Sequence, residues 1–205
     1  MDLWGTIAKE RQALADDLSG LDDTKWKTQS LCDDWTVLEV LSHMASTPEV
    51  TAINFFPKLA GAGFSLNKLS AKQVARISAE GPAGVLALFK SRVSSRKAPP
   101  GPKETWLGET IVHAEDIRRP LGIKHSYADE ALQVSANFYM KSNLVIGGKK
   151  RAAGLTFKAT DSTWAAGSGP EVSGPLASIV LAIAGRKAAL GDLSGPGVES
   201  LSARF

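Results

Sequence analysis

Sulfur ligands and long apolar runs are scarce in this chain. It has one cysteine among 205 residues, so it cannot form an internal disulfide or build a cysteine-rich zinc or iron–sulfur site. Its longest apolar run, 176–184, is interrupted only by Ser178 and is far shorter than the roughly 20 residues that a membrane helix needs. The chain has three histidines, so a transition-metal site must draw on these and on carboxylates.

A strong charge of either sign is also lacking. The 24 Lys and Arg exceed the 21 Asp and Glu by three, which is too little to indicate nucleic acid binding by itself. The basic excess gathers at 90–103 and 149–151, without the aromatic residues that stack on bases. We interpret these groups as solvated helix ends and linkers, with a small anionic ligand as the alternative. No nucleic acid partner is expected.

The composition is that of a globular protein, with 43% hydrophobic and 22% charged residues. The N-terminus runs into Lys9, Glu10 and Arg11, which interrupt any signal-peptide core. We therefore expect a cytoplasmic protein without a membrane partner. The sequence carries no sign of the oligomeric state.

Helical patterns fill the first three-quarters of the chain. Apolar residues at helical spacing predict a helix over 3–18. Thr36 and Glu39 form a capping box that opens the helix carrying His43, and Pro48 predicts a kink or break. The other helices are expected at 71–78, 83–94, 104–119 and 127–144.

The periodicity changes at Gly154. Alternation predicts a strand at 155–160, short strands at 164–166 and 171–173, and a last strand at 198–204, with a helix over 175–190. We expect an α+β fold with two domains. Residues 1–148 form the helical domain, and residues 149–205 form a small β–β–α–β domain that docks on it because it is marginal alone.

Glu109, His113 and Asp116 stand at positions i, i+4 and i+7 of a predicted helix and so share one face. A Glu and a His at this spacing can bind one ion, and a His from a facing helix would complete a three-ligand set. The spacing alone is also typical of a hydrogen-bonded core histidine beside a surface glutamate. Glu39 stands four residues before His43 as well, but the capping box already accounts for it.

Three blocks of the sequence resemble one protein family. Leu31–Met44 is similar to the N-terminal signature of the mycothiol-dependent maleylpyruvate isomerase family, which belongs to the DinB-like metalloproteins. Gly108–Gly122 resembles the second signature. The tail resembles the small C-terminal domain of the family in Thr160-Asp161, Trp164, Gly167, Gly169-Pro170, Gly174-Pro175, Gly185-Arg186 and the closing residues 193–198.

The resemblance implies a DinB-like four-helix bundle followed by a small α/β domain. It implies a divalent metal, expected to be zinc, on His43, Glu109 and His113. It also implies a thiol cofactor, mycothiol or another low-molecular-weight thiol, that acts as a thiolate on a small electrophilic substrate. The enzyme would be an isomerase or a thiol S-transferase, and these residues do not separate the two. The alternative is a DinB-like protein that binds a metal or ligand without turnover.

Two further residues have open roles. Asp116 either orients a metal ligand by accepting its hydrogen bond or pairs with Arg119 or another basic group. Arg186 resembles the arginine that binds a substrate carboxylate, and the alternative is a helix C-terminal arginine stabilised by the dipole.

Cys32 is interpreted as a small packed residue rather than a redox thiol. Trp35 is expected in the core or a pocket wall.

Overall fold

The computed structural model describes residues 1–144 and 146–205. They form two compact units, Met1–His125 and Ser126–Phe205. The first unit is helical and the second contains a small sheet, so the α+β fold class is confirmed. The domain division at 148/149 and the four-helix bundle remain predictions. None of the helices among the described residues is both long and apolar enough to cross a membrane.

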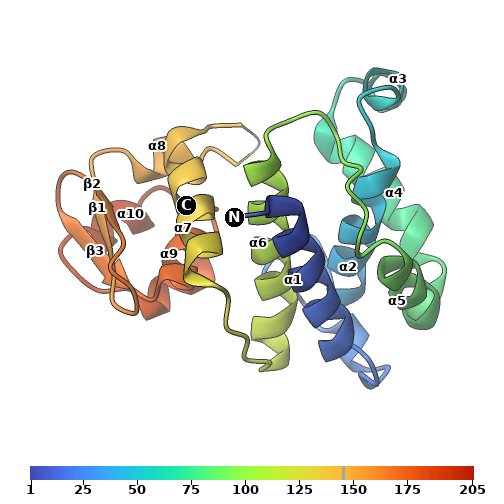
Figure 1. The fold of residues 1–205 in the computed structure, drawn as a ribbon, viewed down its shortest axis with the longest axis horizontal. Helices are drawn as coiled ribbons and strands as arrows, with labels where there is room; N and C mark the ends of the chain where they lie inside the picture. The colour runs from blue at the N-terminus through green and yellow to red at the C-terminus, as the bar shows by residue number, and fades with distance from the viewer. Residues whose placement is uncertain (145) are drawn as a thin grey trace. The chain divides into compact units, whose positions relative to one another are not determined.

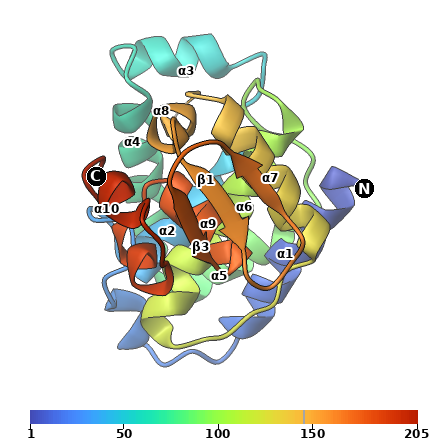
Figure 2. The ribbon, with the colours of Figure 1, turned by 90° about the vertical axis from the view of Figure 1, so that its left-hand side faces the viewer.

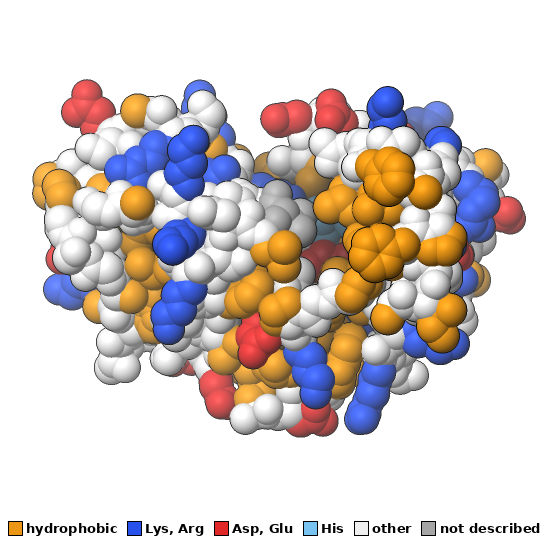
Figure 3. All heavy atoms as spheres, turned by 90° about the horizontal axis from the view of Figure 1, so that it is seen from above, with side chains coloured by type: hydrophobic (Ala, Val, Ile, Leu, Met, Phe, Trp, Pro, Cys, Tyr) orange, Lys and Arg blue, Asp and Glu red, His pale blue; other side chains and the backbone are white. Residues whose placement is uncertain are grey.

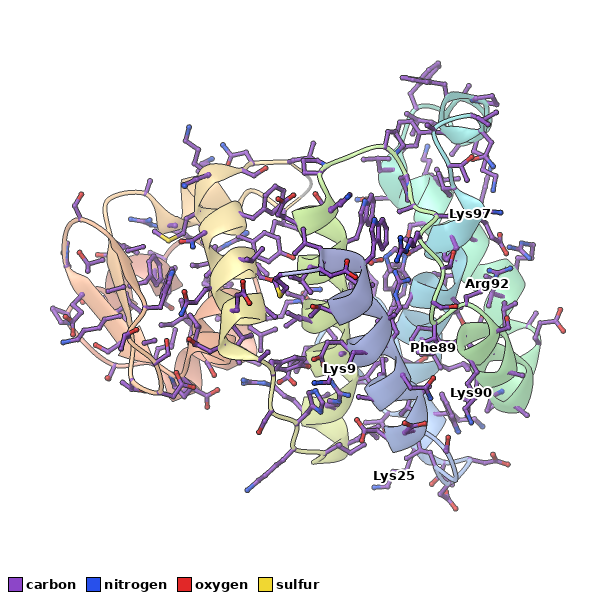
Figure 4. All side chains as sticks on the ribbon, in the orientation of Figure 1. Lys9, Lys25, Phe89, Lys90, Arg92 and Lys97 are labelled. Carbon is purple, nitrogen blue, oxygen red and sulfur yellow. The ribbon has the colours of Figure 1, made fainter. Side chains whose placement is uncertain are left out.

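The first unit is built around α2, which contacts α4, α5 and α6, while α1 packs along α6 (Figure 1). Its core includes Leu41, Phe89 and Ile117, each at most 1% exposed. Figure 4 labels Phe89 within α5 and Arg92 just after it. The helices are α1 (Leu3–Asp17), η1 (Lys25–Lys27), α2 (Val37–Ser46), η2 (Thr47–Glu49), α3 (Phe55–Gly61), α4 (Leu66–Ser78), α5 (Gly81–Ser91) and α6 (Lys103–Leu121).

The capping box at the start of α2 is confirmed. Glu39 Oε2 accepts the Thr36 backbone N–H over 2.8 Å, and the Thr36 hydroxyl accepts the Glu39 N–H over 3.4 Å. The helix ends before the 3₁₀ turn η2 that contains Pro48, as the predicted break requires. The box therefore fixes where α2 starts, and with it the face on which His43 lies.

Helix α6 continues past its predicted end. Pro120 lies inside the last turn, and the helix stops at Gly122, whose φ of 71° is the left-handed C-cap conformation that glycine adopts readily. A proline in the last turn removes one hydrogen bond, to the carbonyl four residues earlier. That carbonyl belongs to Asp116, and it accepts the Leu31 N–H over 3.1 Å instead.

The second unit contains a three-stranded sheet in the order β2-β1-β3, with β1 antiparallel to β2 and parallel to β3. Helix α9 packs on β1 and β3 on one side and on α7 on the other, and Figure 2 views the sheet with α9 behind it. The elements are α7 (Asp129–Lys141), α8 (Gly148–Ala152), β1 (Thr156–Ala159), β2 (Ala165–Gly167), β3 (Glu171–Gly174), α9 (Leu176–Ile183), η3 (Lys187–Asp192) and α10 (Val198–Ser202).

The predicted last strand at 198–204 is wrong. Residues Val198–Ser202 form the short helix α10, in which Leu201 is fully buried. Val198 and Leu201 are three residues apart, which places them on one face of a helical turn but on opposite faces of a strand. The spacing of these two residues therefore favours the helix that the structure has. Near this segment, Ser173 of β3 bridges Ser194 instead.

Exposed hydrophobic side chains gather around α3 in the first unit (Figure 3). They include Ile53, which is 92% exposed, Phe64, which is 75% exposed, and Phe56, which is 68% exposed. Beside them, Glu49 joins Arg76 and Arg92 in ion pairs. Arg92 was expected among solvated basic groups, but its Nη1 also donates to the Ala45 carbonyl over 2.6 Å.

Candidate functional site

His43 of α2 and Glu109 of α6 meet inside the first unit. His43 Nε2 lies 3.6 Å from Glu109 Oε1, and the two side chains are 22% and 13% exposed. His113, one turn after Glu109 on α6, brings its ring centroid to 4.9 Å from that of His43, with the rings inclined by 73°. The three residues that the sequence proposes as metal ligands therefore lie in one partly buried cluster.

Each of these three side chains is held by a neighbour. Ser70 Oγ lies 2.8 Å from His43 Nδ1, and the Thr47 hydroxyl donates to Glu109 Oε1 over 2.8 Å. Asp116 Oδ2 lies 2.9 Å from His113 Nδ1. An imidazole whose Nδ1–H is bonded to an acceptor presents the lone pair of Nε2. With the proton of each ring on Nδ1, toward Ser70 and Asp116, Nε2 is the atom of His43 and of His113 that can act as a metal ligand.

Asp116 is fully buried on α6. Its contact with His113 Nδ1 is the geometry expected of a residue that orients a metal ligand. Arg119, the other partner considered for it, donates from Nε to Glu115 Oε2 over 2.9 Å.

Arg11 of α1 brings a positive charge close to Glu109. The side chain is only 2% exposed, and its Nη1 donates to the Ser95 carbonyl over 3.2 Å. Burial lowers the pKa of Arg11, and the charge of Glu109 opposes that lowering. Sequence reasoning missed this residue, although a signal was present. Arg11 interrupts the apolar positions of the first helix between Ile7 and Leu14, where a charged residue needs a buried partner.

The loop before α2 adds Cys32 and Trp35 to the cluster. Cys32 Sγ lies 3.0 Å from Asp116 Oδ2 and 3.8 Å from His113 Nδ1. The Trp35 ring centroid lies 5.0 Å from that of His43 and 6.5 Å from that of His113. Trp35 therefore forms a wall of the site, as one of the two expectations had it. Cys32 is half-buried, and its side chain makes polar contacts beyond packing.

Arg186 lies in the second unit, just after α9. Its Nη1 donates to the Ala184 carbonyl over 3.2 Å, so the side chain makes a contact with the end of its own helix. The role of Arg186 in catalysis remains a prediction. His125 ends the first unit, where its Nε2 lies 2.7 Å from Glu10 Oε2.

The residue types of the cluster suit a divalent metal ion, although among the described residues the group whose ligand atoms all lie within 4.8 Å of one another is Cys32, His113 and Asp116. Two imidazole nitrogens and one carboxylate oxygen are a ligand set that zinc takes at catalytic sites. Nitrogen and oxygen ligands of a tetrahedral zinc ion stand about 3.3 Å apart at the usual bond lengths. His43 Nε2 and Glu109 Oε1 are 3.6 Å apart, so a small movement of either side chain brings them to that separation.

The fold and the cluster define an α+β protein with a candidate metal site between two helices of its helical unit. The chain belongs to the family described as the mycothiol maleylpyruvate isomerase N-terminal domain, which matches residues 7–118. The resemblance predicted from the sequence motifs is thereby confirmed. The matched segment contains Arg11, Cys32, His43, Glu109, His113 and Asp116.

Two solved structures share this fold. Both are crystal structures of a mycothiol-dependent maleylpyruvate isomerase, one of them a mutant. Each is 18% identical to this chain, with a TM-score of 0.65 over 95% of this chain and 92% of the other. At this identity the likeness establishes the fold alone. No curated protein matches the sequence.

Proposed function

We propose that this protein is a metal-dependent enzyme that uses a low-molecular-weight thiol of the mycothiol type on a small electrophile. The reaction is an isomerisation like that of maleylpyruvate isomerase, or an S-transfer. In an isomerisation the thiolate adds to an activated cis double bond, rotation follows, and the thiolate leaves. In an S-transfer the thiolate displaces a leaving group and stays attached.

The observation that carries the proposal is the meeting of His43, Glu109 and His113 in a chain of this family. A divalent cation bound there would favour the thiolate form of the cofactor, which is the nucleophile. Other side chains of this protein orient the three ligands. Ser70 and Asp116 engage Nδ1 of the two imidazoles, and Thr47 engages one oxygen of Glu109.

The Trp35 ring lies against both imidazoles, with centroid distances of 5.0 Å to His43 and 6.5 Å to His113, and gives the site an apolar side. Arg11 adds a buried positive charge near Glu109, which offsets part of the cost of burying that carboxylate. A small anionic electrophile could also be held by Arg186, whose planar guanidinium suits a carboxylate.

Metal analysis of the purified protein tests the metal centre. We expect about one zinc or similar ion per chain, lost in His43→Ala and in His113→Ala. His125→Gln is the matched control, because it removes the third histidine, which contacts Glu10 outside the cluster. A metal content that is unaffected by either substitution in the cluster, in folded protein, refutes the metal centre.

A thiol assay tests the catalytic proposal separately. The zinc-loaded protein is given mycothiol with maleylpyruvate, or with a simple alkylating electrophile. Conversion of the cis to the trans isomer identifies an isomerase, and consumption of the thiol with the electrophile identifies a transferase. A metal-loaded protein that does neither with a panel of thiols is a binding protein without turnover.

A comparison of charged and uncharged substrates tests the role of Arg186. Arg186→Gln should raise KM for a carboxylate-bearing electrophile by about tenfold or more, since a charge-assisted hydrogen bond is worth about 1.5–3 kcal/mol. The same substitution should have little effect with an uncharged electrophile. Equal effects on both substrates would assign Arg186 to the structure of the second unit.

A further inference from the structure

A second group of metal-ligating atoms lies at the other nitrogen of the His113 ring. Cys32 Sγ, His113 Nδ1 and Asp116 Oδ2 all lie within 4.8 Å of one another. The separations are 3.0 Å from sulfur to oxygen, 3.8 Å from sulfur to nitrogen and 2.9 Å from nitrogen to oxygen. One thiol, one imidazole and one carboxylate therefore face a common point.

The three atoms match the edges of a zinc coordination tetrahedron. With bonds of about 2.3 Å to sulfur and about 2.0–2.2 Å to nitrogen and oxygen, two ligands of a tetrahedral zinc ion stand about 3.3–3.6 Å apart. The observed separations of 3.0, 3.8 and 2.9 Å differ from these values by about 0.6 Å or less, and the sulfur–oxygen pair differs most. Small rotations of the side chains would bring the three atoms to the coordination distances.

The backbone holds this group in place. The Leu31 N–H donates to the Asp116 carbonyl over 3.1 Å, so the loop that carries Cys32 is joined to α6 at the residue that carries the carboxylate. The Cys32 N–H donates to Ser30 Oγ over 3.0 Å, which fixes the start of the turn. His113 and Asp116 are one helical turn apart. A cation would therefore find the ligands already assembled.

We propose that Cys32, His113 and Asp116 form a second site, specific for thiophilic divalent cations such as Cd²⁺ or excess Zn²⁺. Thiolate selects soft and borderline ions over Mg²⁺ and Ca²⁺. Binding replaces the two hydrogen bonds that Asp116 Oδ2 receives from Cys32 and His113. The thiol proton passes to solvent, and the imidazole proton moves from Nδ1 to Nε2 while Nδ1 binds the ion.

This proton shift makes the two sites mutually exclusive. A neutral imidazole has one lone pair on nitrogen, so His113 cannot bind one ion through Nδ1 and another through Nε2 without losing its last N–H proton. An ion held by Cys32 therefore removes His113 from the cluster with His43 and Glu109. The inhibition that follows rests on the proposed function, whereas the existence of the second site does not.

Titration of the purified protein with Cd²⁺ tests the second site. A bond from cadmium to thiolate gives a sulfur-to-metal charge-transfer band in the ultraviolet, and the only sulfhydryl in the chain is Cys32. We expect the band in the unmodified protein and in His43→Ala, which lacks a ligand of the first cluster. We expect no band in Cys32→Ser. Absence of the band in folded His43→Ala overturns the proposal.

Cadmium bound to the Cys32 thiolate alone would also give the charge-transfer band. A further variant tests whether Asp116 takes part in binding. Asp116→Asn should weaken the Cd²⁺ affinity by about tenfold or more, because the amide is a poorer ligand than the carboxylate. An affinity that is unchanged in Asp116→Asn overturns the three-ligand site. If Cys32→Ser does not fold, the rate of alkylation of Cys32 in the unmodified protein tests whether Cd²⁺ binds the thiolate. Saturating Cd²⁺ should slow its alkylation at least tenfold, and an unchanged rate refutes the site.

The two proposals fail in different ways. Loss of the cadmium band with zinc still bound to His43, Glu109 and His113 refutes only the second site. A cadmium band in the unmodified protein, together with a zinc content in Cys32→Ser that does not depend on His43, refutes only the first. Where both sites hold, Cd²⁺ should displace zinc from the unmodified protein and should leave the zinc of Cys32→Ser in place at the same concentration.

Discussion

Leu31 donates its backbone N–H to the carbonyl oxygen of Asp116 over 3.1 Å. Within a regular helix that carbonyl would accept from residue 120, but residue 120 is a proline and has no N–H. The proline thus leaves one acceptor of α6 available to the loop before α2. Together with the contact of Cys32 Sγ with Asp116 Oδ2, this bond joins the loop of Cys32 and Trp35 to the helix of Glu109, His113 and Asp116.

Replacement of this proline should loosen the loop. In Pro120→Ala the new N–H can donate to the Asp116 carbonyl and displace Leu31. A backbone hydrogen bond is worth about 1 kcal/mol, so we expect Cys32 to react about fivefold faster with an alkylating reagent. Pro102→Ala, at the N-cap of the same helix, is the control. An unchanged alkylation rate would show that the loop is held by other contacts.

Loss of the Asp116 carboxylate should weaken the first metal site. Asp116→Asn removes the charged partner of His113 Nδ1, and such partners typically contribute 10- to 100-fold to metal affinity. We expect a fall of about this size in zinc affinity, measured by competition with a chromophoric chelator. Glu115→Gln is the control on the same helix, because Glu115 pairs with Arg119. If the control loses as much affinity, the effect belongs to helix α6 as a whole.

Loss of the Thr47 hydroxyl should lower the zinc affinity measured in the same assay. It donates to Glu109 Oε1 over 2.8 Å, and Thr47→Val removes the donor at nearly constant volume. We expect about a tenfold weaker zinc affinity, with Thr47→Ser retaining most of it. Should the valine variant bind zinc as tightly as the unmodified protein, the orientation of Glu109 does not depend on Thr47.

Glu49 should make the stability of the first unit depend on pH. Burial raises the pKa of Glu49, but hydrogen bonds and charges from Arg76 and Arg92 outweigh burial and hold the pKa below its usual value of 4.5. A carboxyl with a lowered folded pKa stabilises the protein fully above its unfolded pKa. That stabilisation is lost as the pH falls through the folded pKa.

Urea unfolding at several pH values measures this contribution. The unmodified protein should exceed Glu49→Gln by about 1 kcal/mol or less at neutral pH, because the carboxylate is partly solvated. The difference should shrink as the pH falls below about 4. Arg92→Gln should reduce the same pH dependence. A difference that grows toward acid pH would contradict the lowered pKa.

Truncation of Phe89 should lower the free energy of unfolding strongly. Its ring is 1% exposed in the core of the first unit, so Phe89→Ala leaves a cavity and should destabilise by about 3–5 kcal/mol. Ile53→Ala, at a position that is 92% exposed, should stay within about 0.5 kcal/mol. Urea unfolding followed by tryptophan fluorescence checks both. Comparable effects at the two positions would contradict the assigned core.

Local signals in the sequence predicted much of the helical unit. The capping box of Thr36 and Glu39 determines the start of α2, because both of its hydrogen bonds form within four residues. The apolar spacing in the first helix predicts α1 for the same reason. The prediction failed at 198–202, where Val198 and Leu201 stand at helical spacing and the structure buries Leu201 in the helix α10.

The sequence by itself determined which residue types are available for chemistry, three histidines and a single cysteine. It also determined that Glu109, His113 and Asp116 share a face of α6. The meeting of His43 with Glu109, and of Cys32 with Asp116, was decided by the tertiary structure. These partners are 66 and 84 residues apart in the chain, where no helical period applies. Packing of α2 on α6 and the bond from Leu31 to Asp116 bring them within 4 Å. Packing of α1 on α6 buries Arg11 near Glu109, a partner that the spacing of α1 could not indicate.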